Sequence, residues 1–344
     1  MSSVNKRHSI ILPILLLLLM LVSLCSMRYG AVELSLNEIF SGFNKWLSNT
    51  SNLSLNERIF MEIRLPRAIL CVLVGATLAV GGVLMQALFR NPIVEPGLVG
   101  TSSGAAFGAA LYFVLGATFK FNVGEWTLPL AACFGAILST VLVFLFSNSK
   151  QSGKSSIVIL LLTGIAINAL FMSGVGFLSY IARDPQARSI TFWNLGTLSG
   201  ANWHSVIIIG SITCCCFVVA LRYSKHLNAL MIGEDEAQYL GINIKQLKLI
   251  IISINVIMIA TATAFVGVIS FIGLIVPHLL RIIHGSDNRF LIIHGAILGG
   301  ILLSISDLTA RLLLSPAELP IGIVTSVIGV PIFIILLRRK NYFF

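Results

Sequence analysis

Residues 222–248 read RYSKHLNALMIGEDEAQYLGINIKQLK and separate two long hydrophobic blocks of the chain. The stretch carries an acidic triplet at 234–236. The segment from Gly233 to Gly241 is typical of a short helix, because carboxylates in its first turn complement the positive end of the helix dipole and a glycine ends it. Such a helix is either a solvated loop element or a surface on which another protein pushes, and its own sequence leaves both interpretations open.

The two flanking blocks indicate an integral membrane protein. Hydrophobic residues occupy 57% of the 344 positions and charged residues only 10%, whereas a soluble domain is roughly 25% charged. Nine runs contain no Lys, Arg, Asp or Glu, and each is long enough to cross a bilayer. These runs are 8–27, 68–89, 96–119, 126–149, 155–182, 189–221, 249–280, 290–306 and 319–337.

The number of spans differs from the number of runs. Run 249–280 has 32 residues, which as one helix would measure about 48 Å against a hydrocarbon core of about 30 Å, so we expect two spans with a break near 267–273. Run 189–221 begins with small polar residues, so only 203–221 should cross. The sequence therefore predicts an all-α integral membrane protein with ten transmembrane helices in a single domain, 1–344. The expected spans are approximately 8–27, 66–89, 96–117, 127–147, 155–181, 203–221, 247–266, 270–284, 290–310 and 320–338, and a polar connecting segment is expected at 226–245.

An even number of spans places both termini on one side of the membrane. With the N-terminus in the cytoplasm, 14 of the 23 Lys and Arg residues lie on the cytoplasmic side and 9 lie outside. The positive-inside rule favours this orientation. Nine outer cations are still a large number, and they need either an anionic partner or lipid phosphates.

Several function classes lack support in the sequence. The net charge of +10 is spread over both membrane sides rather than gathered in one basic patch, which excludes a nucleic-acid partner. The six cysteines lie within expected spans and are interpreted as small packing residues. The tripeptide Gly-Lys-Ser at 153–155 lacks the glycine five places earlier that a phosphate-binding loop requires. No hydrolase motif is present, so we expect no catalytic residue, metal or cofactor.

Arginines near the outer ends of two expected spans are candidate binding residues. The second span starts near Pro66, a residue suited to the first helical turn, so Arg64 and Arg67 lie at the positive end of the helix dipole. They either extend to lipid phosphates or meet an anionic partner. Asp307 precedes Arg311 by four residues in the favourable order for a helical ion pair, which leaves Arg311 partly available to the outside.

The connection between the second and third spans is a second candidate site. Asn91 and Pro92 begin a tight turn, which is rigid because two prolines flank a carboxylate. Such a turn is either a gate at a pore mouth or a simple connector. Gly100, Gly104 and Gly108 follow at a spacing of four, which favours close helix packing and a compact bundle.

Five stretches of this chain resemble the permease subunits of bacterial importers for iron chelates, haem and cobalamin, the FecCD type, which a separate ATP-binding subunit drives. The stretches are RLPR (64–67), MQALFRNPIVEPGLVGTSSGA (85–105), GEDEAQYLGI (233–242), SFIGLIVPHLLR (270–281) and SPAELPIGIVTSVIGVP (315–331). They occur in the order of the family, and the resemblance covers essentially the whole chain.

The resemblance implies partners and residue roles. The partners are a second copy of the chain in a homodimer, two ATP-binding cassette subunits below, and a periplasmic or surface-tethered substrate-binding protein above, all at the bacterial cytoplasmic membrane. The residues implied for binding-protein docking are Arg64, Arg67 and Arg311. Those implied for the cytoplasmic gate are Asn91, Pro92, Ser155 and Ser156. Those implied for coupling to the ATPase, within segment 226–245, are Gly233, Glu234, Asp235, Ala237, Leu240 and Gly241. The residues themselves agree with this role, because Ala237, Tyr239 and Leu240 offer an apolar contact strip and Glu234 and Asp235 offer charge to a partner.

Three functional hypotheses remain at this point. The first is a permease without catalytic residues that passes an iron chelate inward. Segment 183–203 looks most like the haem members, which favours haem over a ferric siderophore or cobalamin. The second is a self-sufficient ion-coupled carrier, which usually holds ionisable residues near the membrane midplane, whereas the one clear acid within an expected span, Asp307, lies near an end. The third, an intramembrane enzyme, has no motif.

Overall fold

The computed structural model describes residues 2–48, 53–119, 124, 126–147 and 157–338, and within these ranges it contains helices and no strand. The α-helices are α1 (Ser2–Arg28), α2 (Leu36–Leu47), α3 (Leu55–Ile59), α4 (Leu65–Phe89), α5 (Thr101–Phe119), α6 (Thr127–Ser147), α7 (Ile157–Ile181), α8 (Asp184–Asn194), α9 (Trp203–Ile232), α10 (Glu234–Tyr239), α11 (Ile244–Val266), α12 (Ile272–His284), α13 (Asn288–Leu313) and α14 (Ile321–Arg338). A π-helical turn (Phe60–Arg64) joins α3 to α4, and a 3₁₀ turn (Pro96–Val99) precedes α5.

The apolar helices of the described residues account for ten membrane spans. Seven helical segments are at least 18 residues long and apolar enough to cross a bilayer. Three shorter apolar helices, Thr101–Gly116, Ile272–His284 and Ile321–Leu336, bring the number from seven to ten. The prediction of an all-α membrane protein with ten transmembrane helices is confirmed.

Helix α4 is the central element of the bundle, and every residue from Thr77 to Phe89 is buried. It contacts α13 along its length, and Gly75 of α4 faces the backbone of Gly299 so closely that a Cβ on either residue would overlap the other helix. Gly82 approaches the backbone of Gly273 in α12 in the same way. Small residues on facing helices let backbones meet, which explains the dense packing of this centre.

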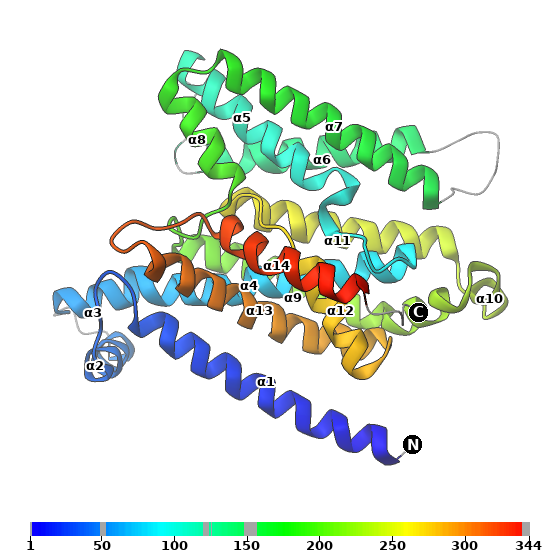
Figure 1. Ribbon diagram of the computed structural model, residues 1–344, viewed down its shortest axis with the longest axis horizontal. Coiled ribbons are helices and arrows are strands. Elements are labelled where there is room, and N and C mark those ends of the chain that lie inside the picture. The colour runs from blue at the N-terminus through cyan, green and yellow to red at the C-terminus, as the bar shows by residue number, and fades with distance from the viewer. Residues whose placement is uncertain (1, 49–52, 120–123, 125, 148–156, 339–344) are drawn as a thin grey trace.

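A second group of helices consists of α5, α6, α7 and α8. This group lies at the top of Figure 1 and covers one side of the central helices. Figure 1 also shows that α2 and α3 lie at one end of the bundle and α10 at the other. We call these the α2 end and the α10 end. Helix α1 begins and α14 ends toward the α10 end, so the start of the first helix and the end of the last helix lie on the same side of the bundle.

The polar segment after the sixth span differs from the expected layout. Helix α9 does not stop at 221 but continues to Ile232. The continuation is amphipathic, because Ser224, Leu227 and Leu230 are buried at a spacing of three while Arg222 and Lys225 are exposed. A polar stretch at a helix end can extend the helix when one of its faces still packs on the core. The extension of α9 places α10 at one end of the bundle.

Run 249–280 is interrupted at 267–271, where the backbone leaves helix α11 and turns back as α12. Gly267 and Phe271 both have positive φ angles, 74° and 70°. The left-handed region is sterically costly for a residue other than glycine, so Phe271 is held there by its surroundings. Helix α12 has only 13 residues, about 20 Å. It therefore begins inside the membrane rather than at a surface.

Candidate functional site

Helix α10 presents the clearest contact surface at the α10 end. Tyr239 is 90% exposed and Leu240 is 67% exposed. Lys248 of α11 donates to the Glu234 carboxylate at 3.0 Å and fixes the start of α10. Asp235 is exposed beside this pair. A short helix that is anchored on both sides and carries an exposed apolar tip is suited to transmit force from a partner.

Two of the residues expected on this surface play a different part. The expectation that Ala237 belongs to the contact strip is wrong, because its side chain is fully buried in the main hydrophobic core, where α10 packs on α9. Gly233 is likewise buried at the junction of α9 and α10. Gly241 ends the helix with a φ of 81°, a conformation that favours glycine. The exposed strip therefore consists of Tyr239 and Leu240.

The turn that begins at Asn91 closes α4 at the α10 end. Arg90 caps α4 in the left-handed conformation, and the amide of Asn91 donates back to the carbonyl of Gln86. The Asn91 side chain accepts a hydrogen bond from the amide of Ile93 at 3.0 Å and so braces the turn around Pro92. Ser155 and Ser156, the other two expected gate residues, lie outside the described residues.

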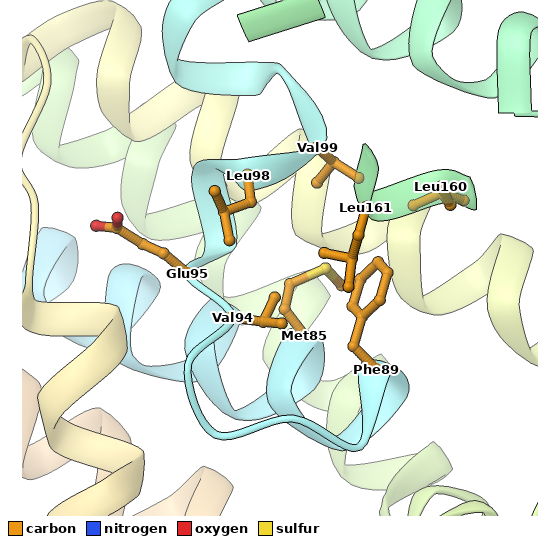
Figure 2. Close-up of a pocket in the computed structure, with 8 residues that line it drawn as sticks. All are labelled: Met85, Phe89, Val94, Glu95, Leu98, Val99, Leu160 and Leu161. Atoms are coloured by element: carbon orange, nitrogen blue, oxygen red, sulfur yellow. The ribbon is translucent and has the colours of Figure 1, made fainter. Parts of the chain in front are cut away.

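Behind this turn, apolar side chains pack tightly against one another, and the charged side chain of Glu95 points away from them. Figure 2 shows Val94 among Met85, Phe89, Leu161 and their neighbours, with Glu95 pointing away from the group. The Glu95 carboxylate accepts a hydrogen bond from the amide of Phe271 at 3.1 Å. Since Phe271 lies about 20 Å from the α10 end of α12, Glu95 reaches membrane depth.

This position corrects an expectation from the sequence. The sequence predicts Asp307 as the one clear acid within a span and places Glu95 in a tight turn between two prolines. The structure folds that segment inward, so that the Glu95 carboxylate lies at the positive end of α12, where helix amides stabilise a negative charge. A polar residue between two prolines gives no sequence signal for such re-entry.

Two buried amide side chains that the sequence interpretation missed hold the same segment in place. Asn255 of α11 donates to the carbonyl of Pro96 at 3.1 Å, and Gln86 of α4 donates to the carbonyl of Leu274 at 3.2 Å. Both side chains are completely buried. A polar residue inside a hydrophobic run is the signal that could have identified them, because a buried amide needs a partner.

The three candidate docking arginines meet at the α2 end. Arg67 binds Asp307 at 2.8 Å and Glu318 at 2.9 Å. Arg311 pairs with Asp307 at 2.9 Å, as the spacing of four predicts. Arg64 differs from both, since its guanidinium donates to the backbone carbonyls of Tyr29 and Val32 and makes no ion pair with a described residue.

Burial changes the interpretation of this cluster. The expectation that Arg311 is partly available to the outside is wrong, because only 4% of it is exposed and its guanidinium also donates to Ser26 and to the carbonyl of Tyr29. The end of α1 covers it. Arg64 and Arg67 are each 8% exposed. Three guanidinium groups face two carboxylates here, so the cluster keeps a net positive charge.

The predicted packing glycines lie at the crossing of α5 and α6. A Cβ on Gly104 would overlap the backbone of Gly135, and a Cβ on Gly108 would overlap the carbonyl of Ala131. Gly100 has a φ of 89° and forms the link between the 3₁₀ turn and α5. These positions explain how the two helices come into backbone contact.

Ten apolar helices with a re-entrant polar segment, and an exposed contact helix at one end, define a polytopic membrane protein. Residues 15–339 match the model of the FecCD transport family. The chain belongs to this family.

Relatives and a solved structure agree with this assignment. The chain is 39% identical over 332 residues to the hemin transport system permease protein HmuU of Yersinia pestis, covering 96% of each chain. It is 34% identical to the vitamin B12 import system permease protein BtuC of Yersinia enterocolitica, over 97% of this chain and 93% of the relative. A metal-chelate type ABC transporter solved in an inward-facing conformation superposes with a TM-score of 0.82 and 31% identity, covering 96% of this chain and 98% of the other.

Proposed function

We propose that this chain is the membrane-spanning permease subunit of an ATP-driven importer, and that it passes an iron chelate, haem in the first place, from a binding protein to the cytoplasm. The observation that carries this proposal is the anchored helix α10 with its exposed Tyr239 and Leu240. Energy from ATP can move the permease only through a surface whose contacts differ between two states. Helix α10 is suited to be that surface.

The choice of haem rests on similarity. The relative with 39% identity is named as a hemin permease, and the segment 183–203 resembles the haem members. Cobalamin is the second candidate, because permeases of vitamin B12 import are 34–35% identical over nearly the whole chain. A ferric siderophore is a further member of the same cargo class.

We assign the α10 end to the cytoplasm. The start of α1, the end of α14 and α10 lie toward this end, and the positive-inside rule favours the same orientation. The assembly we propose holds two copies of the chain and two ATP-binding subunits in the bacterial cytoplasmic membrane, with the binding protein at the α2 end. Hydrolysis of ATP belongs to the separate subunits, because this sequence carries no phosphate-binding loop. The permease itself is not an enzyme.

Docking of the binding protein uses the arginine cluster in this proposal. Arg67 and Arg311 are committed to Asp307, so their role is to hold the ends of α4 and α13 together. Arg64 carries the charge that no described carboxylate neutralises. A carboxylate of the binding protein would be attracted to this net charge. This carboxylate could most easily displace Glu318 from Arg67, because the Glu318 side chain is 39% exposed.

The gate that we propose is the turn at Asn91 and Pro92 together with Ser155 and Ser156. The turn supports this role because it closes the α10 end of α4 and leads directly to the inward-folded Glu95. Helix α9 contacts both α10 and α4. A displacement of α10 would therefore be transmitted through α9 to α4 and to the turn at its end.

The test is uptake by the permease reconstituted in vesicles with its ATP-binding subunit and its binding protein. Haem, a ferric siderophore and cyanocobalamin are supplied in separate experiments, each with and without ATP. We expect ATP-dependent accumulation of haem. Accumulation of cobalamin alone would change the cargo and keep the class, whereas accumulation of no chelate under any condition would contradict the proposal.

A further inference from the structure

A cavity whose lining is mostly apolar but includes six polar residues lies between the α5–α8 group and the central helices. Its volume is about 250 Å³, which holds several water molecules. The polar residues that line it come from the segment before α5 and from α5, α7, α8 and the break before α12, and they are Glu95, Ser102, Ser103, Asn168, Asn194 and Ser270. No Lys, Arg or His lines the cavity.

Some of these polar groups already have partners. Ser103 donates to the Asn168 side chain, whose own amide donates to the carbonyl of Leu98 at 3.2 Å. One oxygen of Glu95 accepts the amide of Phe271. The second Glu95 oxygen and the side chains of Asn194, Ser102 and Ser270 have no hydrogen-bond partner among the described residues. The cavity therefore contains oxygen atoms that are free to bind a ligand.

The charge of the cavity decides what kind of ligand fits. A carboxylate at membrane depth is costly unless an opposite charge lies near it. The amide of Phe271 and the positive end of α12 offset only part of this charge. Among the described residues no group of three or more His, Cys, Asp or Glu could hold a metal ion, which argues against a transition metal. Carboxylate, amide and hydroxyl oxygens instead suit a hard cation or an ammonium group.

We propose that this cavity binds a positively charged group, with Glu95 as the countercharge and with oxygens of Asn194, Ser102 and Ser270 as further ligands. The group is either a monovalent cation from solution or an ammonium group carried by the cargo. A cation bound beside Glu95 leaves the cavity close to neutral, which removes much of the cost of a carboxylate at membrane depth. The second possibility rests on the proposed transport function, and the first does not.

The first experiment needs no transport. The full-length chain in lipid nanodiscs is unfolded by heat in sodium, potassium or choline chloride at equal ionic strength, because the methylated nitrogen of choline has no N–H group to donate to Glu95. Because binding to the folded state stabilises it, we expect the midpoint to be higher by ~2 °C or more in one of the inorganic salts than in the organic one. Glu95→Gln keeps an acceptor for Phe271 and should lose this difference.

Two further variants make the result specific. Glu33→Gln changes an exposed carboxylate in the loop after α1 and should keep the full salt effect. Asn194→Leu leaves the contact between Glu95 and Phe271 in place and should reduce the effect, so the test still works if Glu95→Gln does not fold.

The second experiment separates a free cation from a cargo group. Uptake of a ferric siderophore that bears a free amine is compared with uptake of its N-acetylated derivative, in the wild type and in Glu95→Gln. A salt effect on unfolding identifies a free cation, and a preference for the amine that depends on Glu95 identifies the cargo group. Absence of both would overturn the proposal. If the salt effect persists while no chelate is transported, the transport function fails and the cation site stands.

Discussion

The Nη2 atom of Arg67 lies 2.8 Å from Oδ1 of Asp307, although 240 residues separate the two in sequence. This ion pair joins α4 to α13 at the α2 end of the bundle. Further along the same two helices, Gly75 and Gly299 bring the backbones into contact. The central pair of helices is therefore fixed by charge at one end and by close packing along its length.

Replacing Asp307 should destabilise the fold strongly. In Asp307→Ala, two buried guanidinium groups lose their shared carboxylate, and breaking a buried ion pair typically costs about 3–5 kcal/mol. The control is Glu318→Gln, which removes a partner of Arg67 that is 39% exposed, and whose loss should cost less than about 1 kcal/mol. Thermal unfolding in detergent measures both. Equal midpoints for the two variants would mean that the buried cluster is not a structural clamp.

Adding a methyl group at Gly108, where α5 crosses α6, should destabilise the protein. Gly108→Ala forces α5 away from the carbonyl of Ala131, and overpacking of this kind costs about 1–3 kcal/mol. Gly176→Ala in α7 is the matched control, because a Cβ at that position meets no atom within 4 Å. The control should be neutral or slightly stabilising, since alanine favours a helix more than glycine does. A stable Gly108→Ala protein would show that this contact is looser than the structure has it.

Arg64 should matter for docking more than other cations at the α2 end. We expect Arg64→Gln to weaken binding of the purified binding protein about tenfold, because it removes the guanidinium that no described carboxylate neutralises. Arg188→Gln removes an exposed cation of α8 at the same end and should change the affinity less than twofold, since an exposed charge contributes little. Surface-bound nanodiscs allow both affinities to be measured. Similar losses in both variants would indicate a general electrostatic effect instead of a defined site.

The local stability of helix α2 should depend on pH through the ionisation of Glu38. Hydrogen bonds from the Asn56 side chain and from Ser35 lower the pKa of Glu38 below its ordinary value. A lowered pKa in the folded state means that the contribution of Glu38 is present above the ordinary carboxyl pKa and is lost as the pH falls through the folded value. Hydrogen exchange of α2 should differ between the wild type and Glu38→Gln at pH 7 and pH 5, and the difference should close at lower pH. A difference that did not change with pH would exclude the charge as its cause.

The number of spans and their order can be predicted from the uncharged runs. In a bilayer the backbone N–H and C=O groups must bond to each other, and a helix satisfies them within one segment. The pair of Asp307 and Arg311 follows from helical spacing. The inward fold of Glu95 does not, since it depends on α12 starting inside the membrane and on Asn255 and Gln86, which come from other helices. The burial of Ala237 and Arg311 depends on packing against α9 and α1, and a local pattern carries no information on such neighbours.

The most direct test of whether α10 receives the driving force is ATP-dependent chelate uptake by the reconstituted complex with Leu240→Asp in α10. The variant places a charge on the exposed contact strip, and Gln246→Asp places the same charge on an exposed position at the start of α11. We predict at least a tenfold loss of uptake for Leu240→Asp, with binding-protein affinity unchanged, and near-normal uptake for Gln246→Asp. Full uptake by Leu240→Asp, or uptake without the ATP-binding subunit, would contradict the claim that α10 receives the driving force.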